Sequence, residues 1–303
     1  MQTTNGGVAV ITGGASGLGK AVAQEAASRG MKLVLADVET DALEAAVADF
    51  KGAGADAVGV LTNVADAAAV DELAKRTLAE YGPATLLFNN AGVTSGGFIW
   101  ENTKEDWTWL MGVNVDGVAN GVRSFTPQML KAASADANYR GCIVNTASMA
   151  GLVTGPAMGI YSVSKHAVVA LSECLYHDLS IASSQVTTAV LCPSYVSTNI
   201  GQSHRNRPAE LTNTQRLTAS QIATRQVAQR SLDNGTMTAT QVAAFTFAAI
   251  EAGTFYIFPD TEPLPVVEAR MANILQQANP DFPYDLVPSM KERRDALTSA
   301  SRS

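Results

Sequence analysis

The sequence has few cysteines and histidines, and neither type is spaced for disulfide or metal chemistry. The three cysteines, Cys142, Cys174 and Cys192, lie in apolar segments without a C-x-x-C pair. We therefore expect small buried hydrophobes in a reducing compartment rather than disulfides. The three histidines have no ligand spacing with the cysteines or with one another, so no metal is expected.

Charge is also scarce, and the balance is acidic. Charged residues make up only 16% of the chain, the formal net charge is −7, and no basic stripe occurs. Nucleic acid and anionic membrane surfaces are therefore disfavoured as partners. The sequence contains no run of eighteen apolar residues and no basic N-terminal segment leading into an apolar stretch. These absences predict a cytoplasmic protein that does not enter a membrane.

No Pro/Ser-rich linker divides the chain. A chain of 303 residues could form one large domain or two small ones. Strand-like and helix-like segments alternate without a break from Val8 to about Phe258. The alternation predicts a single α/β domain over residues 1–303, with a doubly wound parallel sheet.

A glycine-rich turn follows the first apolar run. Val8–Thr12 leads into a turn that ends at Gly19, a helical pattern follows, and a second apolar run from Lys32 ends in Asp37. Glycines in this position let the backbone approach a pyrophosphate at a helix N-terminus. Asp37, eighteen residues beyond Gly19, can accept hydrogen bonds from a ribose 2′-hydroxyl. The arrangement predicts dinucleotide binding, against the alternative of a structural tight turn.

Tyr161 and Lys165 lie four residues apart in a segment that reads as a helix from Ile160 to about Ile181. Four residues is about one helical turn, so the two side chains share a face. We expect the ammonium to lower the pKa of the phenol from about 10 toward working pH, which makes it a usable acid or base. On this pair alone, a surface tyrosine packed beside a lysine stem remains an alternative.

Several motifs occur in an order that resembles the short-chain dehydrogenase/reductase family, over roughly residues 6 to 260. They are T-G-x-x-x-G-x-G from Thr12 to Gly19, Asn89-Asn90-Ala91-Gly92, Asn114, Ser148, the Tyr161 and Lys165 pair, and Pro193–Thr198. The resemblance implies a Rossmann-type fold of about seven strands with helices on both faces. It also implies an oxidoreductase that uses a nicotinamide cofactor.

The resemblance implies a catalytic set of Asn114, Ser148, Tyr161 and Lys165. Tyr161 would exchange a proton with the substrate oxygen, and Ser148 would hold that oxygen by a hydrogen bond. Lys165 would lower the pKa of Tyr161 and hold the nicotinamide ribose. Asn114 would interrupt its helix and hold a water, although a satisfied buried amide is an equally open interpretation. Ser148 lacks the G-x-S-x-G context of a hydrolase nucleophile.

The resemblance also implies which residues contact the cofactor. They are Gly13, Ser16, Gly17, Leu18, Gly19, Asp37, Asn63, Val64, Asn90, Ala91, Gly92, Tyr161, Lys165, Pro193, Val196 and Thr198. Asp37 would repel a 2′-phosphate, and the next residues, Val38 and Glu39, are not basic, so NAD is expected. Two residues depart from the family pattern: Asn63 replaces an aspartate, and Ser194 replaces the glycine after Pro193.

The expected substrate pocket has apolar walls. Its residues are Ser148, Leu152, Met158, Tyr161 and Tyr195. We expect no arginine in these loops near Tyr161, which disfavours a carboxylate substrate. The sequence therefore predicts a bulky, hydrophobic secondary alcohol or ketone. A sugar, a steroid or an acyl-thioester remains an alternative, and so does a non-catalytic NAD(H)-binding sensor.

One expected segment lies within the core of residues 6–260, and a second follows it. Residues 195–237 are too long for a plain connection, and the part near 199–237 is predicted as a lid or, alternatively, a surface excursion, with a helix from Leu217 to Leu232. Residues 261–303 are predicted as a helical extension, with one helix from Leu264 to Ala278. From Lys291 the chain is expected to be exposed, and the tail to cover a partner's active site or to pack locally.

The resemblance implies assembly into a homodimer or homotetramer. The helices around Thr103–Leu130 and Ile160–Ile181 commonly form the dimer surface of the family. Trp107 and Trp109, in the first of these segments, are interpreted as packing or interface residues rather than cofactor contacts.

Overall fold

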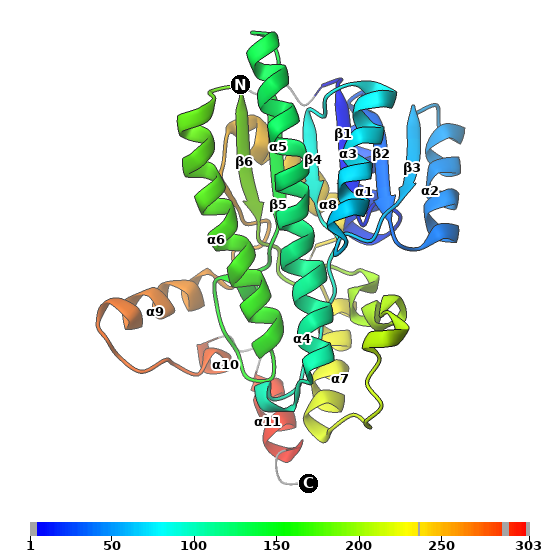
Figure 1. The fold of residues 1–303 in the computed structure, drawn as a ribbon. Helices are drawn as coiled ribbons and strands as arrows, with labels where there is room; N and C mark the ends of the chain where they lie inside the picture. Colours follow the sequence, from blue (N-terminus) through cyan, green and yellow to red (C-terminus); the bar gives the residue numbers. More distant parts are fainter. Residues whose placement is uncertain (1–4, 236, 287–290, 301–303) are drawn as a thin grey trace.

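The computed structural model describes residues 5–235, 237–286 and 291–300, and its centre is a parallel sheet of seven strands (Figure 1). The strand order is β3-β2-β1-β4-β5-β6-β7. The strands are β1 (Val8–Thr12), β2 (Lys32–Asp37), β3 (Ala57–Leu61), β4 (Leu86–Asn89), β5 (Gly141–Thr146), β6 (Val186–Leu191) and β7 (Tyr256–Ile257). The central strands are almost entirely apolar because both faces of a parallel sheet are covered.

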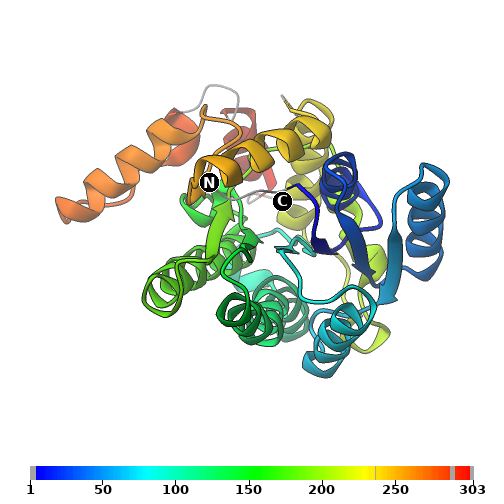
Figure 2. The same cartoon turned by 90° about the horizontal axis from the view of Figure 1, so that it is seen from above.

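Helices pack on both faces of the sheet and form two apolar cores (Figures 1 and 2). One face carries α1 (Gly17–Ser28), α2 (Thr40–Gly52) and α8 (Ala239–Ala252). The other face carries α3 (Ala67–Tyr81), α5 (Gly117–Ala135) and α6 (Gly159–Ala182). The predicted fold class is therefore confirmed: a Rossmann-type, doubly wound α/β fold. The predicted helix from Ile160 to Ile181 is α6, which is one residue longer at each end.

Strand β1 pairs with both β2 and β4, so the strand order reverses there. The connections on the two sides of β1 run in opposite directions. This leaves a crevice beyond the carboxyl ends of the strands. In Figure 1 these ends face the lower half of the molecule, where the segment after β6 and the C-terminal extension lie.

The segment after β6 extends beyond the carboxyl ends of the strands, and its two ends lie next to each other. It leaves at Val196 and returns at Met237, and these two residues form a parallel bridge. Between them lie the short 3₁₀ segments η4 (Asn199–Asn206) and η5 (Ala209–Leu211), followed by α7 (Ala219–Asp233). The predicted helix from Leu217 to Leu232 is thus confirmed as α7. It begins after Thr218, whose hydroxyl accepts a hydrogen bond from the Gln221 amide in a capping box.

A buried ion pair ties this segment to α4 (Lys104–Met111). Arg207 Nη1 lies 2.6 Å from Asp106 Oδ1, and the side chains are only 11% and 3% exposed. The Arg207 guanidinium also lies over the Trp109 ring, 5.1 Å from its centroid. Trp109 is therefore a packing residue, as its segment suggested, and Arg207 fixes the middle of the lid.

The C-terminal extension is helical, as expected, and one residue of its last part is buried rather than exposed. It contains α9 (Leu264–Leu275), which projects from the body in Figures 1 and 2, α10 (Pro283–Leu286) and α11 (Lys291–Ala300). The described side chains of α11 are exposed as expected, except Leu297. This residue is 5% exposed, lies in a cluster with Ala157 and Ala223, and packs α11 against α7. The tail thus packs locally because α7 offers it an apolar patch. Helix α9 ends three residues before the predicted Ala278.

Among the described helices, none combines the length and the apolar composition that a membrane span requires. The predicted division into core, lid and extension, and their folding as a single unit, stay predictions.

The buried ion pair makes a prediction about stability. Asp106→Asn keeps the shape of the side chain but leaves the Arg207 charge without its carboxylate. We expect the free energy of unfolding to fall by about 3 kcal/mol, because one buried charge is left uncompensated. Urea titration followed by circular dichroism measures it.

The matched control is Asp49→Asn, which breaks the pair between Lys20 and Asp49 at 2.8 Å, with side chains 32% and 66% exposed. Because exposed pairs contribute about 0–1 kcal/mol, this variant should stay close to the parent. Equal, small changes in both variants would contradict the anchoring role of Asp106.

Candidate active site

The carboxyl ends of β1, β2, β4, β5 and β6 and the lid segment surround one cavity of about 630 Å³. The expected cofactor residues line this cavity, apart from Gly19. Ser148, Met158, Tyr161 and Tyr195 line it as well, whereas Leu152 and Asn114 do not. The motifs that are spread along the sequence therefore meet at the point where the strand order reverses.

The glycine-rich turn presents the N-terminus of α1 to the cavity. Gly13 and Gly17 have φ values of +64° and +51°, which favour glycine. Gly19 is needed for packing, because a Cβ there would lie 2.0 Å from the Gly13 carbonyl oxygen. The Ser16 side chain makes no capping hydrogen bond, so the first amides of α1 stay available to an anion.

Asn90 joins the two loops on either side of the reversal point. Its backbone amide donates to Thr12 Oγ1 at 2.9 Å, and its side-chain amide donates to the Thr12 carbonyl at 3.0 Å. The Ala91 amide donates to the same hydroxyl at 3.1 Å. Asn90 thus positions the glycine-rich turn beside the end of β4.

Asp37 lies at the end of β2, opposite the first turn of α1. Its Oδ2 accepts a hydrogen bond from the Ala15 amide at 3.0 Å, and its Oδ1 accepts bonds from the Val38 and Glu39 amides at 2.8 and 3.1 Å. These bonds fix a carboxylate at the cavity wall. Asn63 lies exposed on the same wall, with its Oδ1 bonded to the Ala65 amide at 3.1 Å.

Ser148, Tyr161 and Lys165 converge from β5 and α6. Ser148 follows β5, and its Oγ accepts a bond from the Ala150 amide at 3.1 Å and donates to the Pro193 carbonyl at 3.4 Å. Lys165 is 3% exposed, and its Nζ donates to the Thr146 carbonyl at 2.8 Å. The Nζ lies 5.8 Å from the centroid of the Tyr161 ring, so the two side chains share one face of α6.

The expected fall in the pKa of Tyr161 is wrong for this structure. Burial raises the pKa of Tyr161 to about 12, the Ser148 hydrogen bond lowers it, and the nearby Tyr195 raises it. The ammonium of Lys165 points at the Thr146 carbonyl rather than at the phenol oxygen. Burial therefore outweighs the Ser148 hydrogen bond, and the phenol keeps its proton at neutral pH.

Asn114 lies in the π-helical turn η2 (Gly112–Asp116), which interrupts the helix between α4 and α5 as expected. Its Oδ1 accepts a bond from the Val93 amide at 2.8 Å, and its Nδ2 donates to the Val93 carbonyl and to Ser164 Oγ, both at 3.0 Å. These bonds match the satisfied buried amide. A Cβ at Gly92 would lie 3.5 Å from Asn114 Oδ1 and 3.7 Å from Lys165 Nζ, so the two side chains are neighbours. A bound water at Asn114 stays a prediction.

The part of the cavity where the substrate pocket was expected has apolar walls, with one correction. Leu152 packs in a separate core cluster with Val168 and Val169, while its neighbour Val153 lines the cavity. Trp109 and Met158 complete the apolar wall. The sequence pattern identified the right loop but not which of two adjacent apolar residues faces inward.

Two hydroxyls in the cavity wall have no partner among the described residues. Thr146 Oγ1 and Ser162 Oγ are buried and make no hydrogen bond there. Because unpaired buried hydroxyls are costly, such atoms favour a bound polar group. Neither residue was singled out from the sequence, since a lone Ser or Thr after an apolar run carries no distinct signal.

The absence of arginine was expected for the loops near Tyr161 and stays a prediction there, but the wall of the whole cavity contains arginine. Arg205, Arg207 and Arg225 line it, because the lid segment folds back beneath the sheet. Arg207 is held by Asp106, and Arg205 is held by Glu39. Among the described residues, no cluster of three or more His, Cys, Asp or Glu side chains could hold a metal ion.

Comparisons with known proteins identify the family. The family profile described as short chain dehydrogenase matches residues 7–209, and the chain belongs to this family. A short-chain dehydrogenase/reductase from Burkholderia phymatum, solved in complex with NAD, is 48% identical with a TM-score of 0.90, covering 93% of this chain and 98% of that one.

Two further relatives are less similar in sequence. The CLA biosynthesis dehydrogenase/reductase of Lactiplantibacillus plantarum is 33% identical over 278 residues, which cover 90% of this chain and 95% of that protein. The C alpha-dehydrogenase of a Sphingobium species is 37% identical over 204 residues, covering 67% of this chain and 65% of that protein. An oxidoreductase of the short-chain dehydrogenase family is therefore shown.

The burial of Lys165 makes a prediction about pH. Burial lowers the pKa of Lys165 from 10.5 to about 8. The folded protein therefore loses this proton at a lower pH than the unfolded chain, so the ammonium costs stability below about pH 8. That cost disappears as the pH rises toward 10.5.

Lys165→Met should thus be more stable than the parent at neutral pH. The difference in the free energy of unfolding should shrink by about 2 to 3 kcal/mol between pH 7 and pH 10. Urea titrations of both proteins across this range test it. A difference that does not change with pH would contradict the burial argument.

Proposed function

We propose that this chain transfers a hydride between NAD(H) and a bulky, apolar secondary alcohol or its ketone, with Tyr161 as the general acid/base. The observation that carries the proposal is the convergence of Ser148, Tyr161 and Lys165 on one cavity that also holds the dinucleotide motifs. NAD(H), when bound, supplies the carbon that takes or gives the hydride.

The residues present fit this cofactor. The glycine turn and the uncapped first turn of α1 suit a pyrophosphate, and the unpaired Thr146 hydroxyl suits a polar group deeper in the cavity. Asp37 suits a ribose 2′-hydroxyl and would repel a 2′-phosphate. The Burkholderia phymatum relative in complex with NAD supports the same choice.

Each residue of the proposed catalytic set has one physical task. Ser148 would donate a hydrogen bond to the substrate oxygen and hold it beside Tyr161. Tyr161, which carries its proton at neutral pH in the free protein, would give that proton to the oxygen during ketone reduction. Lys165 would bind ribose hydroxyls and fix the position of α6 through Thr146. Asn114, bonded to the Val93 backbone, would position Lys165.

The apolar walls support a hydrophobic substrate. Val153, Met158 and Trp109 offer few groups for the many hydroxyls of a sugar. Steroids and acyl-thioesters also have large apolar parts and remain alternatives. The complete Ser148, Tyr161 and Lys165 arrangement speaks against a non-catalytic sensor.

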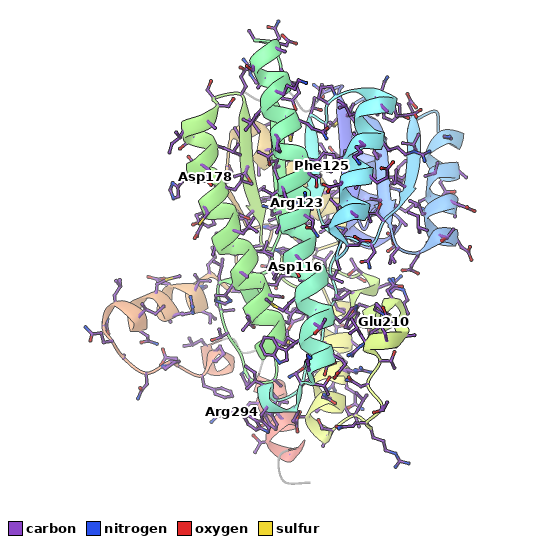
Figure 3. All side chains as sticks on the ribbon, in the orientation of Figure 1. Asp116, Arg123, Phe125, Asp178, Glu210 and Arg294 are labelled. Atoms are coloured by element: carbon purple, nitrogen blue, oxygen red, sulfur yellow. The ribbon has the colours of Figure 1, made fainter. Side chains whose placement is uncertain are left out.

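We further propose a homodimer or homotetramer. Helices α5 and α6 lie side by side on one face of the molecule, and no other described element covers them there (Figures 1 and 3). Helix α6 exposes Val163, Tyr176 and Ile181. Sedimentation equilibrium would give the number of subunits, and a monomer would refute the proposal. The predicted cytoplasmic location stays a prediction.

The central test is Tyr161→Phe. Removing the phenol oxygen should lower kcat by a factor of about 10² to 10⁴, because it removes the proton-transferring group. Binding of NADH, followed by its fluorescence, should change little. Activity should be measured against alcohols and ketones graded by size and charge, in both directions.

The matched control is Tyr256→Phe, at the edge of the sheet, where the hydroxyl bonds Glu173 at 2.6 Å. This variant should keep the parent activity. Turnover retained by Tyr161→Phe would refute the acid/base assignment. A protein that binds NADH but turns over no member of the panel would favour the sensor.

A spectroscopic prediction concerns the charge of Tyr161 without turnover. In the free protein, Tyr161 should form no phenolate below about pH 10, because burial holds its pKa high. The difference in absorbance near 295 nm between the parent and Tyr161→Phe measures this. NAD⁺, whose ring is positively charged, should lower the pKa of Tyr161, whereas neutral dihydronicotinamide should not. A phenolate near pH 7 in the free protein would contradict the prediction.

A further inference from the structure

The lid is fastened to the strand that carries Asp37 by a second charged contact, separate from Arg207. Glu39, two residues beyond Asp37, accepts three hydrogen bonds at its Oε1 from the end of η4. The donors are Arg205 Nη2 at 2.7 Å, Arg205 Nε at 3.1 Å and Asn206 Nδ2 at 2.8 Å. The contact joins segments 166 residues apart in the sequence.

Arg205 is held from its own side as well. Its Nη1 donates to the carbonyls of Asn199 and Gln202 at 3.1 and 3.2 Å. The guanidinium therefore lies between the η4 backbone and the Glu39 carboxylate. The side chains of Arg205 and Glu39 are 34% and 31% exposed.

Glu39, Arg205 and Asn206 line the cavity together with Asp37. The Asp37 end of the cavity is where a ribose 2′-hydroxyl would lie under the proposed function. The hydrogen bonds from Arg205 and then Asn206 hold the pKa of Glu39 below its ordinary value, so this carboxylate stays charged. Two carboxylates and one guanidinium therefore face this part of the cavity.

We propose that Glu39 is a second specificity-determining residue for the coenzyme, acting through Arg205. By holding the guanidinium, Glu39 fastens η4 beside Asp37 and withholds from a 2′-phosphate a nearby cation that could bind it. A guanidinium is well suited to phosphate, because its donors match the phosphate oxygens in pairs. The discrimination against a phosphorylated ribose thus has two parts, repulsion by Asp37 and retention of Arg205 by Glu39.

This inference rests on the proposed function, because it concerns how a dinucleotide ribose is recognised. The competing explanation is an ordinary half-exposed ion pair, which would contribute little to binding. The two explanations differ in what happens to Arg205 once Glu39 loses its charge. A released guanidinium gains a new ligand only if a phosphate lies within its reach.

The experiment compares Glu39→Gln, Arg205→Ala and the double variant with the parent protein. Dissociation constants for NADH and NADPH are measured by coenzyme fluorescence, without substrate and at low and high salt. Glu39→Gln should bind NADPH at least about tenfold more tightly than the parent, with a strong salt dependence. It should bind NADH a few-fold more weakly, because η4 is less firmly fastened.

The double variant decides the mechanism. If the gain in NADPH affinity comes from the released Arg205, it should disappear in Glu39→Gln/Arg205→Ala. Asp49→Asn, which removes a carboxylate from an exposed pair outside the cavity, is the charge-matched control and should leave both constants unchanged.

Two outcomes would overturn the inference. Unchanged affinities in Glu39→Gln would show an ordinary surface pair. A gain that persists in the double variant would show simple loss of repulsion, with no role for Arg205. A parent protein that binds neither NADH nor NADPH would instead refute the proposed function, so the two failures are distinguishable.

Discussion

The burial of the Lys165 ammonium against the carbonyl end of β5 is the interaction on which the candidate site depends. Its Nζ lies 2.8 Å from the Thr146 carbonyl oxygen, in a position that is 3% exposed. Taking a charge out of water is costly, and the lowered pKa of Lys165 reflects that cost. The contact fixes the position of α6 along its axis relative to β5. It therefore places Tyr161 of the helix beside Ser148, which follows the strand. A charged group buried at a cost to stability is a candidate functional residue.

The segment between Val196 and Met237 is held by two ion pairs of different burial. The pair of Arg207 and Asp106 is almost fully buried, whereas the pair of Arg205 and Glu39 is about one third exposed. Breaking the first leaves an uncompensated buried charge, but the second exchanges readily with water and salt. The segment is therefore held more firmly at the end anchored by Arg207 than at the Glu39 end. The packing of α11 on α7 reinforces the anchored end.

What the sequence could predict follows from the range of the interactions involved. The glycine turn, the strand that ends in Asp37 and helix α6 are set by neighbours within a few residues, so local patterns located them closely. Contacts such as Arg207 with Asp106, 101 residues apart, leave no local trace, and the arginines of the cavity wall were therefore missed. The sequence also predicted Leu152 in the cavity wall, where the structure has Val153. Periodicity does not show which residue of an irregular turn faces inward.

The pKa of Tyr161 is another property that the sequence alone could not predict. Sequence spacing reveals the neighbouring ammonium, but only the fold reveals how completely both groups are removed from water. Burial raises the pKa of Tyr161 and lowers that of Lys165, so it pushes both groups toward their neutral forms. Because burial also favours the neutral form of Lys165, this residue cannot supply all of the stabilisation that a Tyr161 phenolate needs. A positive charge brought into the cavity would favour the phenolate most strongly where water is excluded. In such a site the readiness of Tyr161 to accept a proton depends on the charge of the bound coenzyme, which links proton transfer to its oxidation state.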